Sequence, residues 1–486
     1  MSPLLLAFQV SPASSILSVL FLLLLTGVVL VILVDTGEPS RKFAWLFIIA
    51  LLPVVGLLLY LLFGINHRHK HHFDRTYRKY RETFPEGSNP SLDEVLFGER
   101  KIAQVDRYYR PLTHLLSQNQ RPSVSTACEI EVITEGGRKL ELLLQDLQNA
   151  KKSIYMEYFH FGIDDNSRRI RELLMEKARE GLDVRFINEN FANLPIPTFY
   201  YTAMKTAGVK VVNFTDLRYH FLDWITHINY RDHRKIVIID GETGYVGGMN
   251  INNHYFYQWR DTHLRLTGEA VRSLEYLFMD SWQSAKGEDL QDIFTQPETD
   301  PTTGDTLIQI VPDGPDSRWP ILQMGYEWTL LHAKEYVYLQ SPYFAPPESL
   351  LSAMKTAALS GVDVRLMLPA RPDTPILRPV NRSYYREILE AGVRVYERGG
   401  NFMHSKTFVC DDYLTSIGSA NLDYRSFCID YEVNAYIYDT AFAQKNKEIF
   451  FRDMEQCREI TLQQMEEQPW LLRLLQGITR LFAPIL

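Results

Sequence analysis

The sequence lacks two features that mark common functional classes. Only four cysteines occur in 486 residues, and none of them forms a C-x-x-C pair. Neither a zinc knuckle nor a disulfide scaffold follows from this spacing, so we expect reduced, packed thiols. An excess of positive charge is also missing, because 51 lysines and arginines are outnumbered by 59 aspartates and glutamates, for a net charge of −8. This balance argues against a protein that binds nucleic acid through bulk charge.

Charged side chains are absent from two stretches near the N-terminus, Ile16 to Val34 and Phe43 to Phe63. Each run is about 20 residues long, the length of a bilayer-spanning helix, so residues 1–66 are predicted to form a two-helix transmembrane hairpin. A signal peptide is the competing interpretation of the first run, but Met1 to Ser15 has no basic side chain. Basic residues follow the second run and place the rest of the chain on the cytoplasmic side of the plasma membrane: Arg68, Lys70, Arg75, Arg78, Lys79 and Arg81.

Residues 67–125 are predicted to be a polar connector that begins with the cluster HRHKHH, His67 to His72. No carboxylate or thiolate ligand accompanies these histidines, so a solvated patch facing anionic headgroups is the preferred interpretation over a metal site. We expect no metal and no cofactor.

The chain contains an internal repeat. His404, Lys406 and Asp411 repeat His233, Lys235 and Asp240 at one fixed offset, and the same offset relates Gly247 to Gly418, Asn250 to Asn421 and Asp261 to Glu432. Upstream, NAKKSIYMEYFHF matches HAKEYVYLQSPYF, and GLDVRFI matches GVDVRLM. Strands alternate with helices in each copy, which predicts an α/β fold with sheets covered by helices on both faces. Two such domains, residues 126–300 and 301–486, are expected to face each other across a pseudo-two-fold axis.

The repeated phrase predicts a hairpin with a polar edge. His233 and Lys235 are two positions apart on a strand and therefore lie on one face. Asn250, at the end of the return strand, is expected beside them, and His404, Lys406 and Asn421 repeat the arrangement. Two imidazoles, two ammonium groups and two amides around one anion would suit phosphoryl transfer without a metal.

Two carboxylates are assigned to hold the imidazole tautomers, namely Asp261 and Glu432, which follow the histidines of their own copies at equal spacing. Asp240 and Asp411 are expected to brace the hairpin turns. A third His-x-Lys, His332-Ala333-Lys334, lacks the following Asp and the Gly-x-x-Asn sequel, and is taken as incidental.

These paired His-x-Lys-x4-Asp phrases, together with WLFIIALLPVVGLLLYLLFG from Trp45 and GSANLDYRSFCIDYEVNA from Gly418, resemble the bacterial cardiolipin synthases of the phospholipase D superfamily over nearly the whole chain. The resemblance implies two pseudo-symmetric phospholipase D-like α-β-α sandwich domains after the hairpin. It implies that two phosphatidylglycerols yield cardiolipin and glycerol through a phosphatidyl-histidine, with His233 as nucleophile and His404 as acid then base. The sequence itself is symmetric on that choice. The segment Cys428–Asp430 departs from the family pattern, without an expected chemical consequence.

The C-terminal segment supports a lipid substrate independently. One face of the predicted helix is apolar and the other is polar with Arg473, Gln476 and Arg480, as in an interfacial helix, although packing on the domain is an equal alternative. The apolar face comprises Trp470, Leu471, Leu474, Leu475, Ile478 and Phe482. Weaker candidates for headgroup contacts adjoin the matched positions: Tyr158, Tyr343, Arg260 and Arg425.

Three alternatives to a synthase remain open from sequence. A phospholipase D-type hydrolase would resolve the phospho-histidine with water, a nucleic-acid phosphodiesterase would use the same residues, and a non-catalytic scaffold would retain a relic site. Membrane anchoring and the acidic balance argue against nucleic acid as a partner. The expected partners are phosphatidylglycerol and other anionic membrane lipids, and an oligomer is possible.

Overall fold

The computed structural model describes residues 12–34, 39–60, 64, 101–119, 123–214, 230–285, 304–481 and 483. The N-terminal helices form one unit of the chain, and the two repeated halves together form a second, larger unit. The cluster His67 to His72, most of the predicted connector and Phe482 lie outside the described residues.

The N-terminal unit contains the helices α1 (Pro12–Val34), α2 (Pro39–Leu51) and α3 (Pro53–Leu59). The second apolar run does not form the single helix that the sequence predicts, because Pro53 lacks an N–H and forces Leu52 out of the helical region, to φ −134° and ψ 72°. After this break, Gly56 packs so closely on α2 that a Cβ there would lie 2.8 Å from the Ile49 Cα. Within the described ranges, no helix is both long enough and apolar enough to cross a membrane, so the predicted transmembrane hairpin is not supported.

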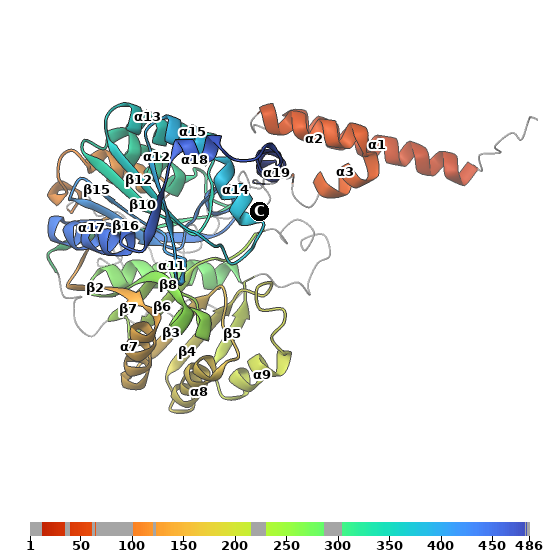
Figure 1. The fold of residues 1–486 in the computed structure, drawn as a ribbon. Helices are drawn as coiled ribbons and strands as arrows, with labels where there is room; N and C mark the ends of the chain where they lie inside the picture. Colours follow the sequence, from red (N-terminus) through yellow and green to blue (C-terminus); the bar gives the residue numbers. More distant parts are fainter. Residues whose placement is uncertain are drawn as a thin grey trace, which may run out of the picture. The chain divides into compact units, whose positions relative to one another are not determined.

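The first half builds a mixed sheet whose strand order is β14-β8-β7-β6-β3-β4-β5, with β2 beside β8 (Figure 1). The helices that accompany it are α7 (Gly136–Asn149), α8 (Asp165–Arg179), α9 (Thr198–Thr206) and α11 (Ala270–Ser284). The strands are β2 (Glu129–Glu135), β3 (Ser153–Tyr158), β4 (Asp183–Asn188), β5 (Lys210–Asn213), β6 (Lys235–Ile239), β7 (Thr243–Gly247), β8 (Trp259–Thr267) and β14 (Phe402–Met403). A single π-helical turn, η3 (His254–Gln258), precedes β8.

The second half builds a nine-stranded sheet in the order β1-β9-β18-β16-β15-β10-β12-β13-β19. Its strands are β1 (Ser125–Ala127), β9 (Thr306–Asp313), β10 (Tyr336–Gln340), β12 (Asp363–Pro369), β13 (Arg394–Arg398), β15 (Thr407–Cys410), β16 (Leu414–Gly418), β18 (Glu432–Tyr438) and β19 (Cys457–Ile460). A separate parallel pair joins β11 (Phe344–Ala345) to β17 (Leu422–Asp423).

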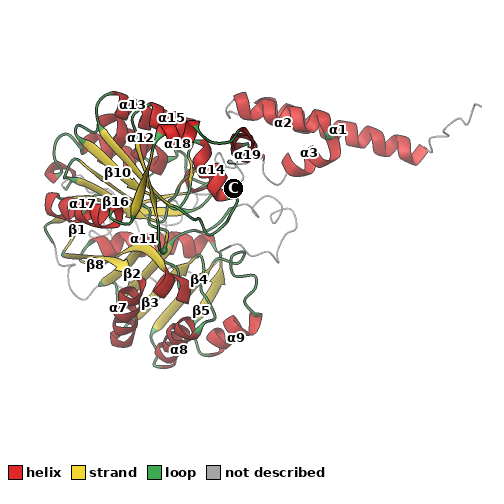
Figure 2. Cartoon of the chain, viewed as in Figure 1, coloured by secondary structure: helices red, strands yellow, loops and turns green. Residues whose placement is uncertain are grey.

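The helices that accompany this second sheet include a short 3-10 turn, η2 (Ile102–Gln104), and a series of α-helices, of which η2 and α6 come from the predicted connector. These are α6 (Arg110–Leu116), α12 (Ile321–His332), α13 (Glu348–Leu359), α14 (Leu377–Ser383), α15 (Tyr385–Glu390), α16 (Tyr424–Cys428), α17 (Thr440–Met454), α18 (Leu462–Glu466) and α19 (Trp470–Arg480). Figure 2 shows each yellow sheet with red helices packed along it.

Helix α11 lies between the two sheets and explains why the halves form one unit. Its residues from Ala270 to Trp282 are all buried. They share an apolar cluster with strands of both sheets, including Ile236 and Val246 of the first and Ile308 and Val433 of the second. Separate clusters fill the opposite faces of the sheets. The predicted α/β architecture, with helices on both faces of each sheet, is therefore confirmed.

The predicted domain limits are crossed in both directions. Strand β1 lies at the start of the first half but pairs with β9 of the second sheet, whereas β14 comes from the second half and pairs with β8 of the first. Part of the expected connector is also a structural element, because α6 packs against α12. Its Leu112 and Leu116 are fully buried there. Sequence order alone gave no signal for these exchanges, because edge strands pair according to tertiary contacts.

The C-terminal helix α19 combines the two interpretations that the sequence left open. Its polar side packs on the domain, where Gln476 and Thr479 are buried and Arg480 forms an ion pair with Glu387. Its apolar side faces outward, with exposed fractions of 65% for Trp470 and 61% for Leu471. This orientation is the reverse of an ordinary amphipathic helix packed on a core.

Candidate active site

The repeated phrase forms the same β-hairpin in each half. Strand β6 pairs with β7 and β15 pairs with β16, so the predicted strand, turn and return strand are confirmed in both copies. Asp240 and Asp411 occupy the turns, and each carboxylate accepts three backbone N–H groups from the segment leading into the neighbouring strand. They brace the hairpins, as expected, and do not line the cavity between the halves.

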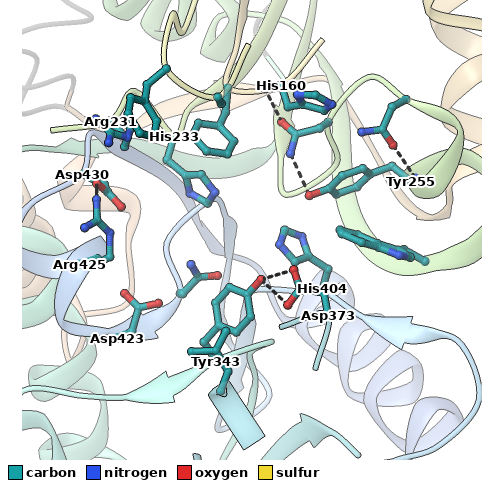
Figure 3. Close-up of a pocket in the computed structure, with 18 of the residues that line it drawn as sticks. His160, Arg231, His233, Tyr255, Tyr343, Asp373, His404, Asp423, Arg425 and Asp430 are labelled. Atoms are coloured by element: carbon teal, nitrogen blue, oxygen red, sulfur yellow. Dashed lines mark hydrogen bonds and ion pairs between the residues drawn. The ribbon is translucent and has the colours of Figure 1, made fainter. Parts of the chain in front are cut away.

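His233 and His404 stand just before these hairpins, and each is fixed by the main chain of the opposite half. The His233 N–H donates to the Tyr431 carbonyl at 2.9 Å, and the His404 N–H donates to the Arg260 carbonyl at 2.7 Å. Tyr431 is the repeat counterpart of Arg260, so the two contacts are pseudo-symmetric. Both imidazoles line one cavity at the junction of the halves (Figure 3).

The two candidate orienting carboxylates are exchanged between the halves. Glu432 accepts from His233 Nδ1, at 2.9 Å to Oε1, and Asp261 accepts from His404 Nδ1 at 2.7 Å. The sequence located each carboxylate by its spacing from the histidine of its own copy, whereas in the structure each one contacts the histidine of the other copy. The reason is that β8 and β18 begin at the junction, where β8 contacts β16 and β18 contacts β7 of the opposite hairpin.

The two lysines lie beneath the histidines and are almost fully buried. Each ammonium donates to the carbonyl of the histidine two positions earlier. Burial lowers the pKa of Lys235 to about 7 and that of Lys406 to about 8. Lys406 Nζ also lies 2.8 Å from Nδ1 and 3.1 Å from Nε2 of His404. A bound anion would favour the charged form of both lysines and would be stabilised by it.

Both imidazoles are neutral at pH 7 in this environment. Burial, followed by the Lys406 ammonium, lowers the pKa of His404 to about 4. Burial and the neighbouring Lys235 hold the pKa of His233 well below its usual range. Because each Nδ1 donates its proton to a carboxylate, the lone pair of each ring is on Nε2, as a nucleophile or a general base requires. In His404 this nitrogen lies 3.1 Å from Lys406 Nζ.

The carboxylates differ in charge state although their positions are related. Burial acts to raise the pKa of Asp261, but Lys406 and His404 outweigh it and hold that pKa below the usual range. Burial raises the pKa of Glu432 to about 7. Glu432 also accepts hydroxyl hydrogen bonds from Ser419 and from Ser426, the latter at 2.7 Å. The Asp261–His404 pair is thus charge-assisted, whereas the Glu432–His233 pair belongs to a wider network.

The cavity that both histidines line has a volume of about 910 Å³, the size of a small-molecule site. One wall comes from the first half and the other from the second (Figure 3). Its polar lining includes His160, Arg231, His233, Asn250, Asn252, Tyr255, Tyr343, Asp373, Asn381, His404, Asn421, Asp423, Arg425 and Asp430. Its apolar lining includes Phe159, Phe191, Leu194, Pro195, Trp259 and Leu377.

The two asparagines predicted as amide donors both line this cavity but are engaged differently. Asn250 accepts from the His160 N–H at 3.2 Å through Oδ1 and donates to the Tyr255 hydroxyl at 2.9 Å through Nδ2. The side-chain oxygen of Asn421 has no hydrogen-bond partner among the described residues. The two copies are therefore not equivalent toward a ligand.

Of the four weaker candidates, the structure brings two to the cavity. Tyr343 lines it with its ring centroid 6.2 Å from that of His404, and Arg425 lines it while paired with Asp430 at 3.0 Å. Tyr158 is buried in the core of the first half. Arg260 instead forms a buried ion pair with Asp453 across the junction. Neither of these two lines the cavity.

Several cavity residues were not predicted from the sequence. His160 is the repeat counterpart of Tyr343, so the aligned stretches could have revealed it. Asp430 belongs to the segment that departs from the family pattern, and it lines the cavity. Arg231 stacks on Phe191 with its guanidinium 3.7 Å from the ring centroid. Asp373 comes from a loop that the repeat does not align, so no sequence signal pointed to it.

Among the residues that the structure describes, no group of three or more His, Cys, Asp or Glu side chains is arranged to hold a metal ion.

Comparison with known families agrees with this geometry. The family described as "Cardiolipin synthase, PLD-like domain" matches residues 143–282 and 328–454, which include both hairpins. The family described as "Phospholipase_D-nuclease N-terminal" matches residues 19–64.

Curated relatives match over nearly the whole chain. A cardiolipin synthase of Alkalihalophilus pseudofirmus is 37% identical over 480 residues, which cover 97% of this chain and 94% of the relative. The major cardiolipin synthase of Bacillus subtilis is 35% identical over 486 residues, covering 98% of this chain and 100% of the relative. The crystal structure of a phosphatidylserine synthase from Haemophilus influenzae covers 79% of this chain and 100% of its own at a TM-score of 0.57. Its identity of 16% indicates a shared fold alone.

Proposed function

The chain belongs to the family of cardiolipin synthases with phospholipase D-like domains, and from this premise we propose that it transfers a phosphatidyl group from one phosphatidylglycerol to another. The products are cardiolipin and glycerol. The observation that supports this proposal best is that His233 and His404, one from each copy of the repeat, line one cavity with a carboxylate on each Nδ1.

In the first step, Nε2 of His233 attacks the phosphorus of the donor lipid. The bond between phosphorus and the oxygen of the headgroup glycerol breaks. His404 gives a proton to the leaving oxygen. The donor phosphodiester carries a negative charge, which favours the protonated form of His404 and offsets the burial and the Lys406 ammonium that lower its pKa in the free site. Lys235 and Lys406 stabilise the charge that develops on the non-bridging oxygens.

In the second step, a hydroxyl oxygen of the acceptor attacks the phosphatidyl-histidine. His404, now neutral, removes the hydroxyl proton, and the bond between phosphorus and His233 breaks. The choice of His233 as nucleophile is supported by its more open position, with 12% of its side chain exposed against 5% for His404. The rings of Tyr255, Trp259 and Phe402 surround His404, with centroids at 5.3, 5.4 and 5.9 Å from its own.

The test is an analysis of products. Purified full-length protein incubated with phosphatidylglycerol vesicles should release glycerol and form cardiolipin in equal amounts. Phosphatidate and glycerol without cardiolipin would identify a hydrolase and overturn the proposal. A nuclease activity on single-stranded DNA that falls steeply with salt would instead identify the nucleic-acid phosphodiesterase that the sequence left open as an alternative.

We also propose that the protein works at the plasma membrane, with the N-terminal helices anchored in it and the catalytic halves on the cytoplasmic side. Outward-facing side chains of α1 and α2 support this location, because Leu23 is 64% exposed and Phe43 is 73% exposed. Sealed inside-out membrane vesicles provide the test, since added protease should degrade the catalytic halves in them. Protection of those halves would reverse the proposed orientation.

The apolar face of α19 supports contact with the same bilayer. Its exposed side chains include Trp470, Leu474 and Ile478, while Arg473 provides a positive charge beside anionic headgroups. In protein without residues 1–66, which the proposed anchor no longer holds, Leu474→Glu should reduce the fraction bound to phosphatidylglycerol vesicles by several-fold, as judged by flotation. The matched control is Leu359→Glu on α13, which is exposed and apolar but outside α19.

A further inference from the structure

The wall of the cavity that comes from the second half has acceptor groups that its repeat counterpart lacks. Asn421 is only 6% exposed, lines the cavity, and has a side-chain oxygen without a partner among the described residues. Its counterpart Asn250 already uses its oxygen and its amide hydrogen within the first half. An unsatisfied buried oxygen costs free energy, which a hydrogen-bond donor on a ligand would recover.

Asp423 adds a carboxylate to this wall. It is 8% exposed, and it caps α16 by accepting the Ser426 N–H at 2.8 Å. Its repeat counterpart is Asn252, which accepts the Tyr255 N–H at 3.2 Å in the same way. Because an amide serves as the cap in the first half, the negative charge of Asp423 is not needed for the fold.

A second carboxylate stands at the rim of the cavity. Asp373 accepts from the Tyr343 hydroxyl at 3.0 Å and 3.1 Å, and the Tyr343 ring packs edge-on against His404. Asp423 and Asp373 both act on Lys406, opposing the effect of burial on its pKa. Figure 3 shows Tyr343 and Asp373 of this wall beside His404, and Asp423 beside Arg425, which is paired with Asp430.

Carboxylates and an amide oxygen accept hydrogen bonds and repel phosphate, so this wall suits a neutral hydroxyl-bearing group rather than a second anion. We propose that Asn421, Asp423 and the Tyr343–Asp373 pair form the acceptor-alcohol subsite, which binds the glycerol headgroup of the second lipid through its hydroxyls. This inference rests on the proposed transferase function, and it names the part of the cavity that makes an alcohol a better acceptor than water.

The subsite determines from which side of the cavity the acceptor hydroxyl attacks in the second step. Bound there, the headgroup presents one hydroxyl to Nε2 of His404 and the phosphatidyl-histidine at His233 lies across the cavity. The new bond forms between that hydroxyl oxygen and phosphorus, the bond to His233 Nε2 breaks, and the hydroxyl proton passes to His404. A second hydroxyl of the same glycerol donates to the carboxylates, an interaction that water alone cannot make in the same geometry.

The experiment compares acceptor use in Asp423→Asn and Asp373→Asn. Each variant keeps the side-chain shape, and Asp423→Asn keeps the helix cap that Asn252 demonstrates. Glycerol, cardiolipin and phosphatidate are measured together from phosphatidylglycerol vesicles with the full-length protein. We expect the ratio of cardiolipin to phosphatidate to fall about tenfold in Asp423→Asn, as expected for loss of one charge-assisted hydrogen bond. Glycerol release should fall less than cardiolipin formation.

The matched control is Asp439→Asn, the same change at another helix cap, where Asp439 accepts the Phe442 N–H at 2.7 Å away from the cavity. It should leave the product ratio at the wild-type value. Equal losses of glycerol and cardiolipin in both cavity variants, or an unchanged ratio, would overturn the subsite. Wild-type protein that makes no cardiolipin would instead overturn the proposed function, so the two failures are distinguishable.

Discussion

The two halves of the catalytic unit use the same hairpin and differ in what surrounds it. Both place His-x-Lys before a strand, both brace the turn with an aspartate, and in both the histidine N–H donates to a backbone carbonyl of the other half. The surroundings of the orienting carboxylates are different. In the first half, a Cβ at Gly248 would lie 2.3 Å from the Asp261 carboxylate, so glycine is required there. In the second, Ser419 occupies the counterpart position and donates to Glu432.

This difference shows that two copies of one motif can acquire different properties through the residues that surround them. The shorter Asp261 is ionised and forms a direct pair with His404. The longer Glu432 is held by two hydroxyls and has a pKa raised by burial to about 7. The two proposed steps move protons in opposite directions and therefore need two histidines in different environments. This difference comes from the carboxylates and hydroxyls that contact the histidines, and not from the repeated motif.

The largest expected effect is the loss of either histidine. His233→Ala and His404→Ala should each reduce cardiolipin formation by about a thousandfold or more, because the proposed nucleophile or the proposed proton donor is removed. His332→Ala is the matched control from the third, incidental His-x-Lys, and it should stay within about twofold of wild type. Mass spectrometry of enzyme quenched with denaturant at neutral pH should locate the phosphatidyl group on His233, and a label on His404 would reverse the assigned roles.

The contact between the halves offers a second comparison. Arg260 forms a buried bidentate pair with Asp453, whereas its counterpart Tyr431 stacks under Arg234 at 5.1 Å. Asp453→Asn leaves a buried guanidinium uncompensated and should lower the free energy of unfolding by about 3–5 kcal/mol. Tyr431→Leu should lower it by about 1–2 kcal/mol through loss of the cation–π contact.

Urea denaturation measures both changes. The control is Arg394→Gln, which removes an exposed pair with Glu459 and should cost less than about 1 kcal/mol. Equal effects of Asp453→Asn and Arg394→Gln would show that the junction is not desolvated as described.

The pH dependence of stability should have opposite signs for His404 and Glu432. The pKa of His404 is lowered from 6.5 to about 4, so the unfolded chain binds the extra proton and stability is lost as pH falls from 6.5 to 4. The pKa of Glu432 is raised from 4.5 to about 7, so its contribution is present below pH 4.5 and is lost as pH rises to 7. Each contribution is on the order of 3 kcal/mol.

These contributions are measured as differences from wild type across pH 4 to 8. Relative to wild type, His404→Asn should gain stability as pH falls, and Glu432→Gln should gain stability as pH rises. A parallel pH profile for either variant and wild type would contradict the corresponding shift.

The smallest expected effect separates the two carboxylates in catalysis. At pH 7, Asp261→Asn should reduce activity about tenfold more than Glu432→Gln, because a charge-assisted bond is lost in the first case and a partly protonated group in the second. The gap should narrow above pH 8 as Glu432 ionises fully. Initial rates of glycerol release provide the measurement, and equal losses at pH 7 would remove the proposed asymmetry.

The sequence by itself determined the repeat, the hairpin and the set of side chains. A constant offset between the two copies and the period of two along a strand are local properties of the chain, so His233, Lys235 and Asn250 could be placed together with their second copies. The bracing aspartates followed from turn chemistry in the same way.

Only the tertiary structure decided which half completes which site. The hydrogen bond from His233 to Glu432 spans 199 residues and that from His404 to Asp261 spans 143, and a symmetric repeat gives no reason to exchange them. The availability of Asn421 and the outward apolar face of α19 were equally invisible in the sequence. These features depend on which surfaces are covered when the halves pack, and packing is decided by the whole chain.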